Sequence, residues 1–380
     1  MSTELRPLTA FRAVAALLVF LNHYSGLRAG VADHWWQAIA IEGHAGVTLF
    51  FVLSGFLICL RYFPAVASGQ FSARNYAFKR VARIGPPYWV VLGAVAFFAA
   101  PRTIYSVYLP QPLINWTFTQ AYFQQLLFSG ILPAWSLTIE VTFYVLAPLI
   151  LLTCWHYAAR GQSILHGLAW WVLGLASAGM LLVWLSNQLG WVQPYGFMND
   201  PVYVLVYTVA GRGMDFAIGI FAAHYFLEHR DRLWTHPQSA MRASLLLLVG
   251  VVGVVGTQVV MNRAGGPLVA WYLNAVIALF GGLCIVALTC GVMPVSRWMS
   301  SRLWVYLGSI SYALYLLQTT FFVRPFYDQL DKHSPLTIVI MYMVLSVIAA
   351  VLYEVVEKPA RRWLLAVFGR NADAYKAAIY

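Results

Sequence analysis

The sequence predicts an all-α polytopic membrane protein, built as a bundle of about ten transmembrane helices. Hydrophobic residues make up 61% of the 380 residues and charged residues only 10%, a balance that a soluble domain of this size cannot bury. Apolar segments of about 20 residues, the length that crosses a bilayer, recur along the whole chain. No polar stretch is long enough for a soluble domain, so we expect one transmembrane domain over residues 1–380.

Ten apolar segments are candidate spans. They are 8–26, 43–61, 84–100, 134–155, 166–187, 202–228, 242–261, 268–292, 303–323 and 336–356. The third is short because we expect residues 62–83 to form a loop, and the sixth is unusual because charged residues lie within it. Pro359 should end the last helix, since proline removes a hydrogen-bond donor of the helix backbone.

The basic residues predict the orientation, because cytoplasmic loops of membrane proteins are enriched in lysine and arginine. With the N-terminus inside, seventeen of the 24 basic residues fall in cytoplasmic segments and five in outer segments. Both termini and residues 62–83 are therefore expected in the cytoplasm, and the aromatic-rich loop 101–133 outside. The formal net charge of +11 then reflects this orientation and does not indicate nucleic-acid binding.

Arg12 and His23 lie inside the first apolar segment, and ionisable residues within a membrane span indicate a functional site. Eleven residues make about three helical turns, so both side chains leave the same face, roughly 16 Å apart along the axis. We expect both to face one cavity, at two depths. The alternative is a buried structural ion pair together with a hydrogen-bonded histidine.

Glu140 is the acidic candidate on the outer side. It follows Trp135, the expected outer start of the fourth span, by five residues, which places it roughly 7 Å below the interface and near the expected depth of His23. A carboxylate beside an imidazole would fix its tautomer and stabilise the imidazolium, as a general base requires. Alternatively, each residue bonds to another helix. His44, at the outer end of the second span, and Trp135 are candidates for the acceptor side.

Arg212 and Asp215 are spaced i, i+3 in the sixth span and are expected to form a structural intramembrane ion pair. The four cysteines show no CxxC or metal-ligand spacing. We therefore predict no metal site, and packing is the expected role of these cysteines.

Several sequence blocks resemble the acyltransferase 3 family of integral-membrane acyltransferases. LRPLTAFRAVAALLVFLNHY is similar to the family's opening block, with Arg12 and His23 on its arginine and histidine. GVTLFFVLSGFLI and WSLTIEVTFY are similar to two further blocks, the second with Glu140 on its acidic position. The resemblance runs from Leu5 to Trp363. This chain departs from the common pattern at Thr48, Val141 and Gln318, and we assign these three positions no role.

The resemblance implies transfer of an acyl group, usually acetyl, from cytoplasmic acyl-CoA to a hydroxyl of an envelope or exported polysaccharide or lipid-linked glycan. His23 would be the general base. Arg80 and Arg83, spaced i, i+3, are expected on one helical face at the inner start of the third span, and with Arg12 they would hold the phosphates of acyl-CoA, because a guanidinium presents a planar fork of donors. Acyl-CoA would be a co-substrate, with no tightly bound cofactor, and the protein would lie in a bacterial inner membrane.

Other interpretations stay open at this point. Arg80 and Arg83 are equally suited to anchoring the inner face to anionic lipid. Intramembrane Arg, His and Glu residues also fit a proton-coupled transporter or flippase of a glycan, although the motif blocks are not duplicated as two related halves would require. A third possibility is an acyltransferase with a small-molecule or lipid acceptor. The sequence does not indicate the oligomeric state.

Overall fold

A computed structural model describes residues 5–24, 42–99, 111–234, 238–264, 266–291, 293–320, 322–330 and 334–368. Within these ranges the chain is helical and has no β-strand beyond one isolated bridge between Phe123 and Phe197. Nine helical segments of this described part are long and apolar enough to cross a membrane. The predicted all-α polytopic fold is therefore confirmed.

The long helices follow the predicted segments in order. They are α1 (Arg6–Tyr24), α3 (Ala45–Ala67), α4 (Ala73–Ala99), α6 (Trp135–Ala159), α7 (Ile164–Gln188), α9 (Val209–Trp234), α10 (Ser239–Ala264), α11 (Pro267–Leu288), α13 (Arg302–Leu317) and α15 (Pro335–Leu352). Shorter elements are η2 (Glu42–His44), α5 (Gln111–Trp116), η3 (Gln120–Tyr122), η4 (Gln124–Leu126), η5 (Leu132–Ala134), α8 (Pro201–Tyr207), α12 (Pro294–Met299), α14 (Arg324–Asp328), the π turn η6 (Tyr353–Glu357) and α16 (Lys358–Phe368).

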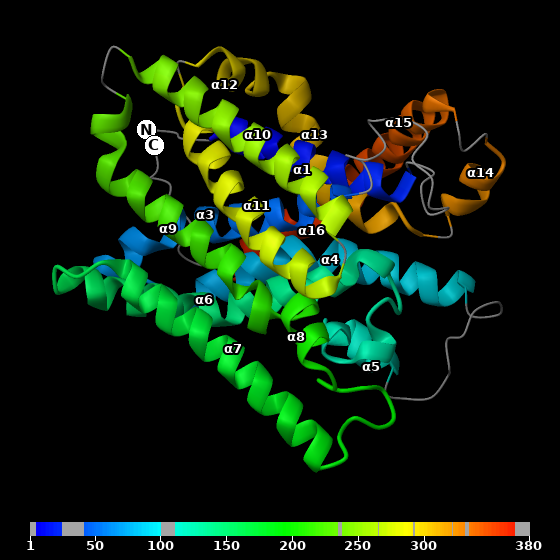
Figure 1. The fold of residues 1–380 in the computed structure, drawn as a ribbon. Helices are drawn as coiled ribbons and strands as arrows, with labels where there is room; N and C mark the ends of the chain where they lie inside the picture. The colour runs from blue at the N-terminus through cyan, green and yellow to red at the C-terminus, as the bar shows by residue number, and fades with distance from the viewer. Residues whose placement is uncertain are drawn as a thin grey trace.

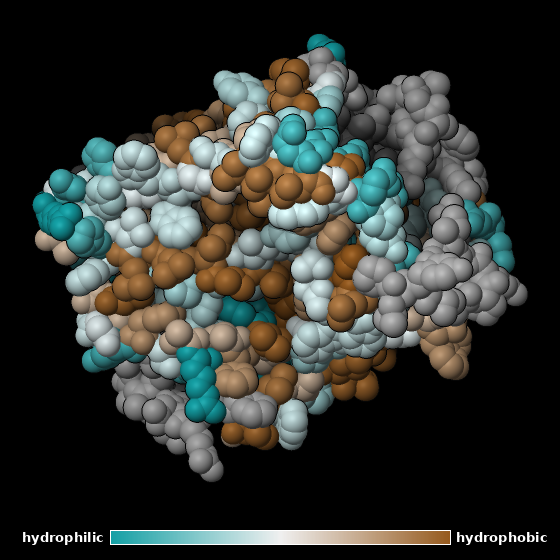
Figure 2. Space-filling model, turned by 90° about the horizontal axis from the view of Figure 1, so that it is seen from below, coloured by the Kyte–Doolittle hydropathy of each residue, from teal (hydrophilic) through white to brown (hydrophobic). Residues whose placement is uncertain are grey.

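Small residues bring the central helices into close contact. A Cβ added at Gly308 of α13 would lie 1.8 Å from the backbone oxygen of Thr9 in α1, and one at Gly219 of α9 would lie 2.0 Å from that of Val52 in α3. Close approach through small residues is how membrane helices gain packing energy without a hydrophobic driving force between them. α7 runs along the lower edge of the bundle in Figure 1. Apolar side chains cover much of the face in Figure 2, as expected for contact with lipid.

α13 is the ninth predicted span, but it has only 16 residues, about 24 Å, against a hydrocarbon thickness of about 30 Å. Its contacts agree with its place in the order. Gly308 near its start meets Thr9 near the start of α1, and the Tyr24 hydroxyl at the end of α1 donates to the backbone oxygen of Gln318. α1 and α13 are therefore parallel, as a first and a ninth crossing must be.

Two boundaries around residues 62–83 differ from the prediction. Residues 62–83 are mostly helical, because α3 extends to Ala67 and α4 begins at Ala73, where the Ser72 hydroxyl accepts the amide N–H of Asn75 at 3.3 Å. Lysine and arginine form helices well, and their long stems carry the charge away from the backbone. The expected loop is therefore wrong over most of residues 62–83, whereas Arg80 and Arg83 lie on a helix, as their i, i+3 spacing predicts.

Three further expectations are corrected. The sixth span is split into α8 and α9 by an extended residue, Thr208. Pro359 does not end the last helix: the chain passes through the π turn η6 into α16, and Pro359 falls in the first turn of α16, where a missing N–H is tolerated. The expected loop 101–133 holds α5 and short 3₁₀ turns from residue 111 onward, and its residues 101–110 lie outside the described ranges.

Candidate active site

A cavity with an empty volume of about 690 Å³, its open part included, lies between five helices. Its polar lining comes from α1, α3, α4, α6 and α13, and its remaining walls are apolar. The polar residues are Arg12, Ser54, Arg80, Arg83, Ser136, Glu140, Tyr144, Tyr312 and Tyr315. The cavity thus brings together four of the residues singled out in the sequence, namely Arg12, Arg80, Arg83 and Glu140.

Glu140 is held by two hydroxyl groups. Its Oε1 accepts hydrogen bonds from Ser54 Oγ at 2.8 Å and from Tyr144 Oη at 2.5 Å. Ser136, Glu140 and Tyr144 follow one another at four-residue spacing, so they lie on one face of α6. That spacing was visible in the sequence, whereas the contact with Ser54 depends on how α3 packs against α6.

Arg80 lies among three tyrosine rings. Its guanidinium carbon is 5.7, 5.8 and 5.4 Å from the ring centroids of Tyr62, Tyr76 and Tyr144, and its Nη2 donates to Tyr62 Oη at 3.4 Å. Aromatic faces attract a cation without neutralising its charge. Arg80 Nε is buried and has no hydrogen-bond partner. The charge of Arg80 therefore remains available to an anion, a property that the sequence did not reveal because the three tyrosines come from α3, α4 and α6.

Arg12 and Arg83 both line the cavity, and Arg12 is subject to charges of both signs. The charge of Arg83 repels that of Arg12, while Glu357 and Glu140 attract it. Glu357 comes from the π turn η6 and is buried, with 6% of its surface exposed. The sequence pattern around Pro359 indicated only a helix end, so Glu357 was missed as a neighbour of this site.

His23 lies in the last turn of α1 and does not line this cavity. The depth of His23 in the bundle can be compared with that of Glu140 through α13. The backbone oxygen of Gln318, just after α13, accepts a hydrogen bond from Tyr24, the residue after His23. Tyr315, three residues before Gln318, forms a hydrogen bond with Ser136 of α6 at 2.7 Å. Glu140 lies four residues beyond Ser136, so the levels of His23 and Glu140 differ by roughly 10 Å along the helix axes. The structure thus groups Glu140 with Arg12, while the catalytic pairing of Glu140 with His23 stays a prediction.

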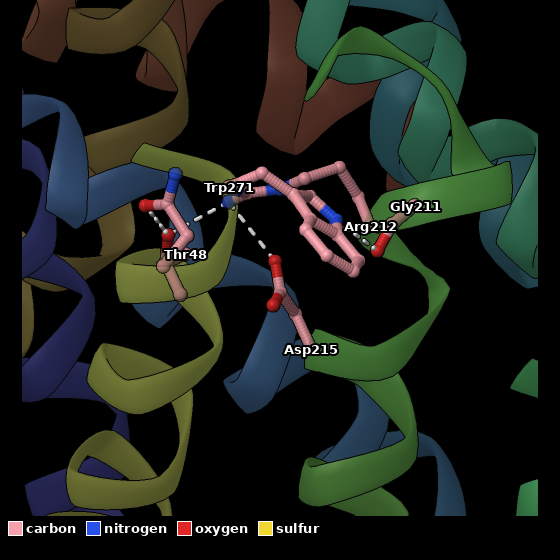
Figure 3. A network of polar contacts seen from close by, with 6 residues as sticks. Thr48, Gly211, Arg212, Asp215 and Trp271 are labelled. Atoms are coloured by element: carbon pink, nitrogen blue, oxygen red, sulfur yellow. Dashed lines mark hydrogen bonds and ion pairs between the residues drawn. The ribbon is translucent and has the colours of Figure 1, made fainter. Parts of the chain in front are cut away.

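Arg212 belongs to a separate, closed network (Figure 3). It forms an ion pair with Asp215 at 2.9 Å and donates to Thr48 Oγ1 at 2.7 Å, and Thr48 in turn donates to Asn274 Oδ1 at 2.9 Å. All four side chains are buried. Trp271 donates its indole N–H to the backbone oxygen of Gly211, which fixes the start of α9 against α11. The predicted ion pair is present, and Thr48, to which we assigned no role, is its polar neighbour.

The acceptor-side candidates His44 and Trp135 do not line the cavity. His44 directly precedes α3, and the positive charge of Arg212 acts on its imidazole. Trp135 is the first residue of α6 and packs edge-on against Tyr207, with ring centroids 5.2 Å apart.

Gln318, one of the three positions to which we assigned no role, is 1% exposed, and neither the oxygen nor the nitrogen of its side-chain amide has a hydrogen-bond partner.

Comparisons with known proteins agree with the resemblance. The family model described as Acyltransferase domain, Acyl_transf_3, matches residues 7–355. A Staphylococcus aureus (strain COL) protein named "Putative O-acetyltransferase" is 24% identical over 384 residues, covering 93% of this chain. The chain spans only 57% of that relative's length. The Streptomyces mycarofaciens protein named "Acyltransferase MdmB" is 26% identical over 339 residues, covering 83% of this chain and 78% of that protein.

No solved structure matches the chain. The helical bundle, the cavity that gathers Arg12 and Glu140, and a family match over nearly the whole length point to one assignment. This chain belongs to the acyltransferase 3 family.

Proposed function

We propose that this protein is a membrane O-acyltransferase that moves an acyl group, most simply acetyl, from cytoplasmic acyl-CoA to a hydroxyl of an envelope or exported polysaccharide or lipid-linked glycan. The observation that carries the proposal is the cavity between transmembrane helices in which Arg12, Arg80 and Arg83 meet Glu140. The family match and the names of the relatives support the acyl-transfer chemistry.

The three arginines suit the donor end of the reaction. Guanidinium groups bind phosphates through paired N–H donors, and Arg80 keeps its charge because tyrosine rings surround it. Acyl-CoA would place its phosphates here and extend its pantetheine arm along α1, from Arg12 toward His23. The three-turn spacing of these two residues on one helix face agrees with such a path.

His23 is the proposed general base. Its imidazole would take the proton of the acceptor hydroxyl as that oxygen attacks the thioester carbonyl. The new C–O bond forms, the C–S bond breaks, and coenzyme A leaves as a thiolate that takes up the proton. General bases of this kind contribute roughly 10²–10⁴-fold to rate.

The decisive experiment uses the purified full chain in detergent with radiolabelled acetyl-CoA. Hydrolysis of the thioester, or transfer of label to a glycan acceptor, is the expected result. The alternative is a proton-coupled carrier, which the split of the sixth span at Thr208 favours, since broken helices build many transporter sites. Uptake of a glycan into vesicles without hydrolysis or transfer would overturn the enzyme proposal.

The proposed location is the bacterial inner membrane, with both termini in the cytoplasm. Ser72, between α3 and α4, and Gln188, at the end of α7, are exposed and should lie on opposite sides. After substitution to cysteine, an impermeant thiol reagent added to intact cells should label Ser72→Cys poorly and Gln188→Cys well. The four native cysteines are buried, so their background labelling should be low. The reverse pattern would invert the orientation.

A further inference from the structure

Glu357 is a buried carboxylate in an unusual part of the backbone. It ends the π turn η6, between α15 and α16, and only 6% of its surface is exposed. Its Oε2 is buried and has no hydrogen-bond partner. Single π turns within helices occur often at functional sites, and a buried carboxylate with an unsatisfied oxygen requires a reason.

The surroundings of Glu357 supply that reason. η6 packs against α4 and α13, both of which line the cavity. Three arginines act electrostatically on Glu357: Arg12 of α1, Arg83 of α4 and Arg361 of α16. Arg12 and Arg83 line the cavity and Glu357 does not. The carboxylate of Glu357 therefore lies outside the cavity lining, yet close enough to Arg12 and Arg83 for its charge to act on both.

Charge balance explains why a carboxylate is needed there. Arg12 and Arg83 repel each other, and unbalanced charge within a membrane span is costly. Glu140 offsets this repulsion within the cavity, where it also accepts two hydroxyl donors. Glu357 offsets it from outside the cavity lining, where it does not occupy the space that a ligand would fill.

We propose that Glu357 is a positioning residue: the negative charge of its buried carboxylate, outside the cavity lining, keeps the guanidinium groups of Arg12 and Arg83 on the cavity wall in the arrangement that binds the phosphates of acyl-CoA. This inference rests on the donor site of the proposed function. It assigns Glu357 no contact with the substrate.

The first test measures the affinity of the purified full chain for coenzyme A by calorimetry. Glu357→Gln keeps the shape of the side chain and removes its charge, and it should raise Kd roughly tenfold. Glu357→Asp should recover part of the affinity. Glu354→Gln is the matched control, because Glu354 lies in the same turn, is exposed and pairs with Lys358 at 2.6 Å. Its Kd should equal that of the unmodified protein.

The proposal and its alternative predict opposite changes in the affinity for coenzyme A. If Glu357 were only a background negative charge, its loss would favour a polyanion and coenzyme A would bind more tightly. Tighter or unchanged binding by folded Glu357→Gln protein would overturn the proposal.

The second test needs no ligand. Glu357→Gln should lower Tm, and adding Arg83→Gln should restore part of the loss, because the second change removes the charge that the first leaves unbalanced. Strictly additive losses in Tm would overturn the charge pairing. If the unmodified protein binds no coenzyme A, the donor site of the proposed function fails and the positioning role fails with it, while this cycle still decides the charge pairing.

Discussion

Two buried arginine sites in this bundle differ in the way their charge is satisfied. At the closed network, Arg212 has an ion pair with Asp215 and a hydrogen bond to Thr48, and its side chain is buried, with Nε as the one nitrogen that is buried without a hydrogen-bond partner. At the cavity, the side chains of Arg12, Arg80 and Arg83 are partly exposed and face an empty space of about 690 Å³, its open part included. Glu140 lines the same cavity, and its carboxylate accepts hydrogen bonds from two hydroxyl groups.

An arginine within a membrane span therefore does not by itself indicate function. Arg212 contributes to packing between α3, α9 and α11, since its partners come from these helices. The cavity arginines carry charge that the protein leaves incompletely neutralised next to a space, which is the condition for binding an anion. The following experiments test whether the two sites divide stability and ligand binding in this way.

The largest expected effect is on the rate of acyl transfer, and it comes from His23, which belongs to neither arginine site. His23→Ala should lower acyl transfer by about 10²–10⁴-fold, because the proton acceptor is lost. Affinity for coenzyme A should hold, since His23 does not line the cavity. His156→Ala is the control, as His156 is exposed near the end of α6. Full transfer by well-folded His23→Ala protein would remove His23 from the mechanism.

Breaking the closed network should affect stability. Asp215→Ala leaves Arg212 buried without its ion-pair partner and should lower the free energy of unfolding by about 3–5 kcal/mol. Thermal unfolding in detergent measures this loss. The double variant Arg212→Met/Asp215→Leu, which removes both charges, should be less destabilised. Normal Tm together with lost affinity for coenzyme A would instead make this network part of the binding site.

Changes to the cavity arginines should affect ligand binding. Arg80→Ala and Arg83→Ala should each weaken coenzyme A binding by about tenfold or more, since hydrogen bonds to charged groups contribute about 1.5–3 kcal/mol. Arg83→Lys should recover only part of the affinity, because the planar fork is lost. Arg74→Ala, at an exposed position earlier in α4, is the control. Unchanged calorimetric affinity in both alanine variants would assign Arg80 and Arg83 to lipid anchoring.

The smallest effect is expected at Glu140. Glu140→Gln keeps an oxygen that Ser54 and Tyr144 can bond, so transfer activity should fall only a few-fold, whereas Glu140→Ala should lose more because both hydroxyl donors are left without their acceptor. Steady-state transfer assays on both variants compare the two. A loss in Glu140→Gln as large as that in His23→Ala would show that the charge itself takes part in the chemistry.

Much of the site follows from local sequence features. Arg212 and Asp215 pair because three residues make nearly one helical turn. Arg12, Arg80, Arg83 and Glu140 were identified as polar residues in or beside apolar spans, and all four line the cavity. Arg80 and Arg83 were expected on one helical face at the start of the third span, but the start of α4 at Ala73 was not predicted, because residues 62–83 were expected to form a loop.

The class of fold follows from composition and from the length of the apolar segments, which together settle whether a chain crosses a membrane. The sequence also identified most of the polar residues in and beside the spans, namely Arg12, Arg80, Arg83 and Glu140. Which of these side chains lie near one another depends on how the helices pack. Ser54 reaches Glu140 and Tyr62 reaches Arg80 across helices, and the charge of Glu357 acts on Arg12, because small residues such as Gly219 and Gly308 set how closely the helices approach. Helical periodicity fixes the face that a side chain leaves, and packing between helices fixes what it touches.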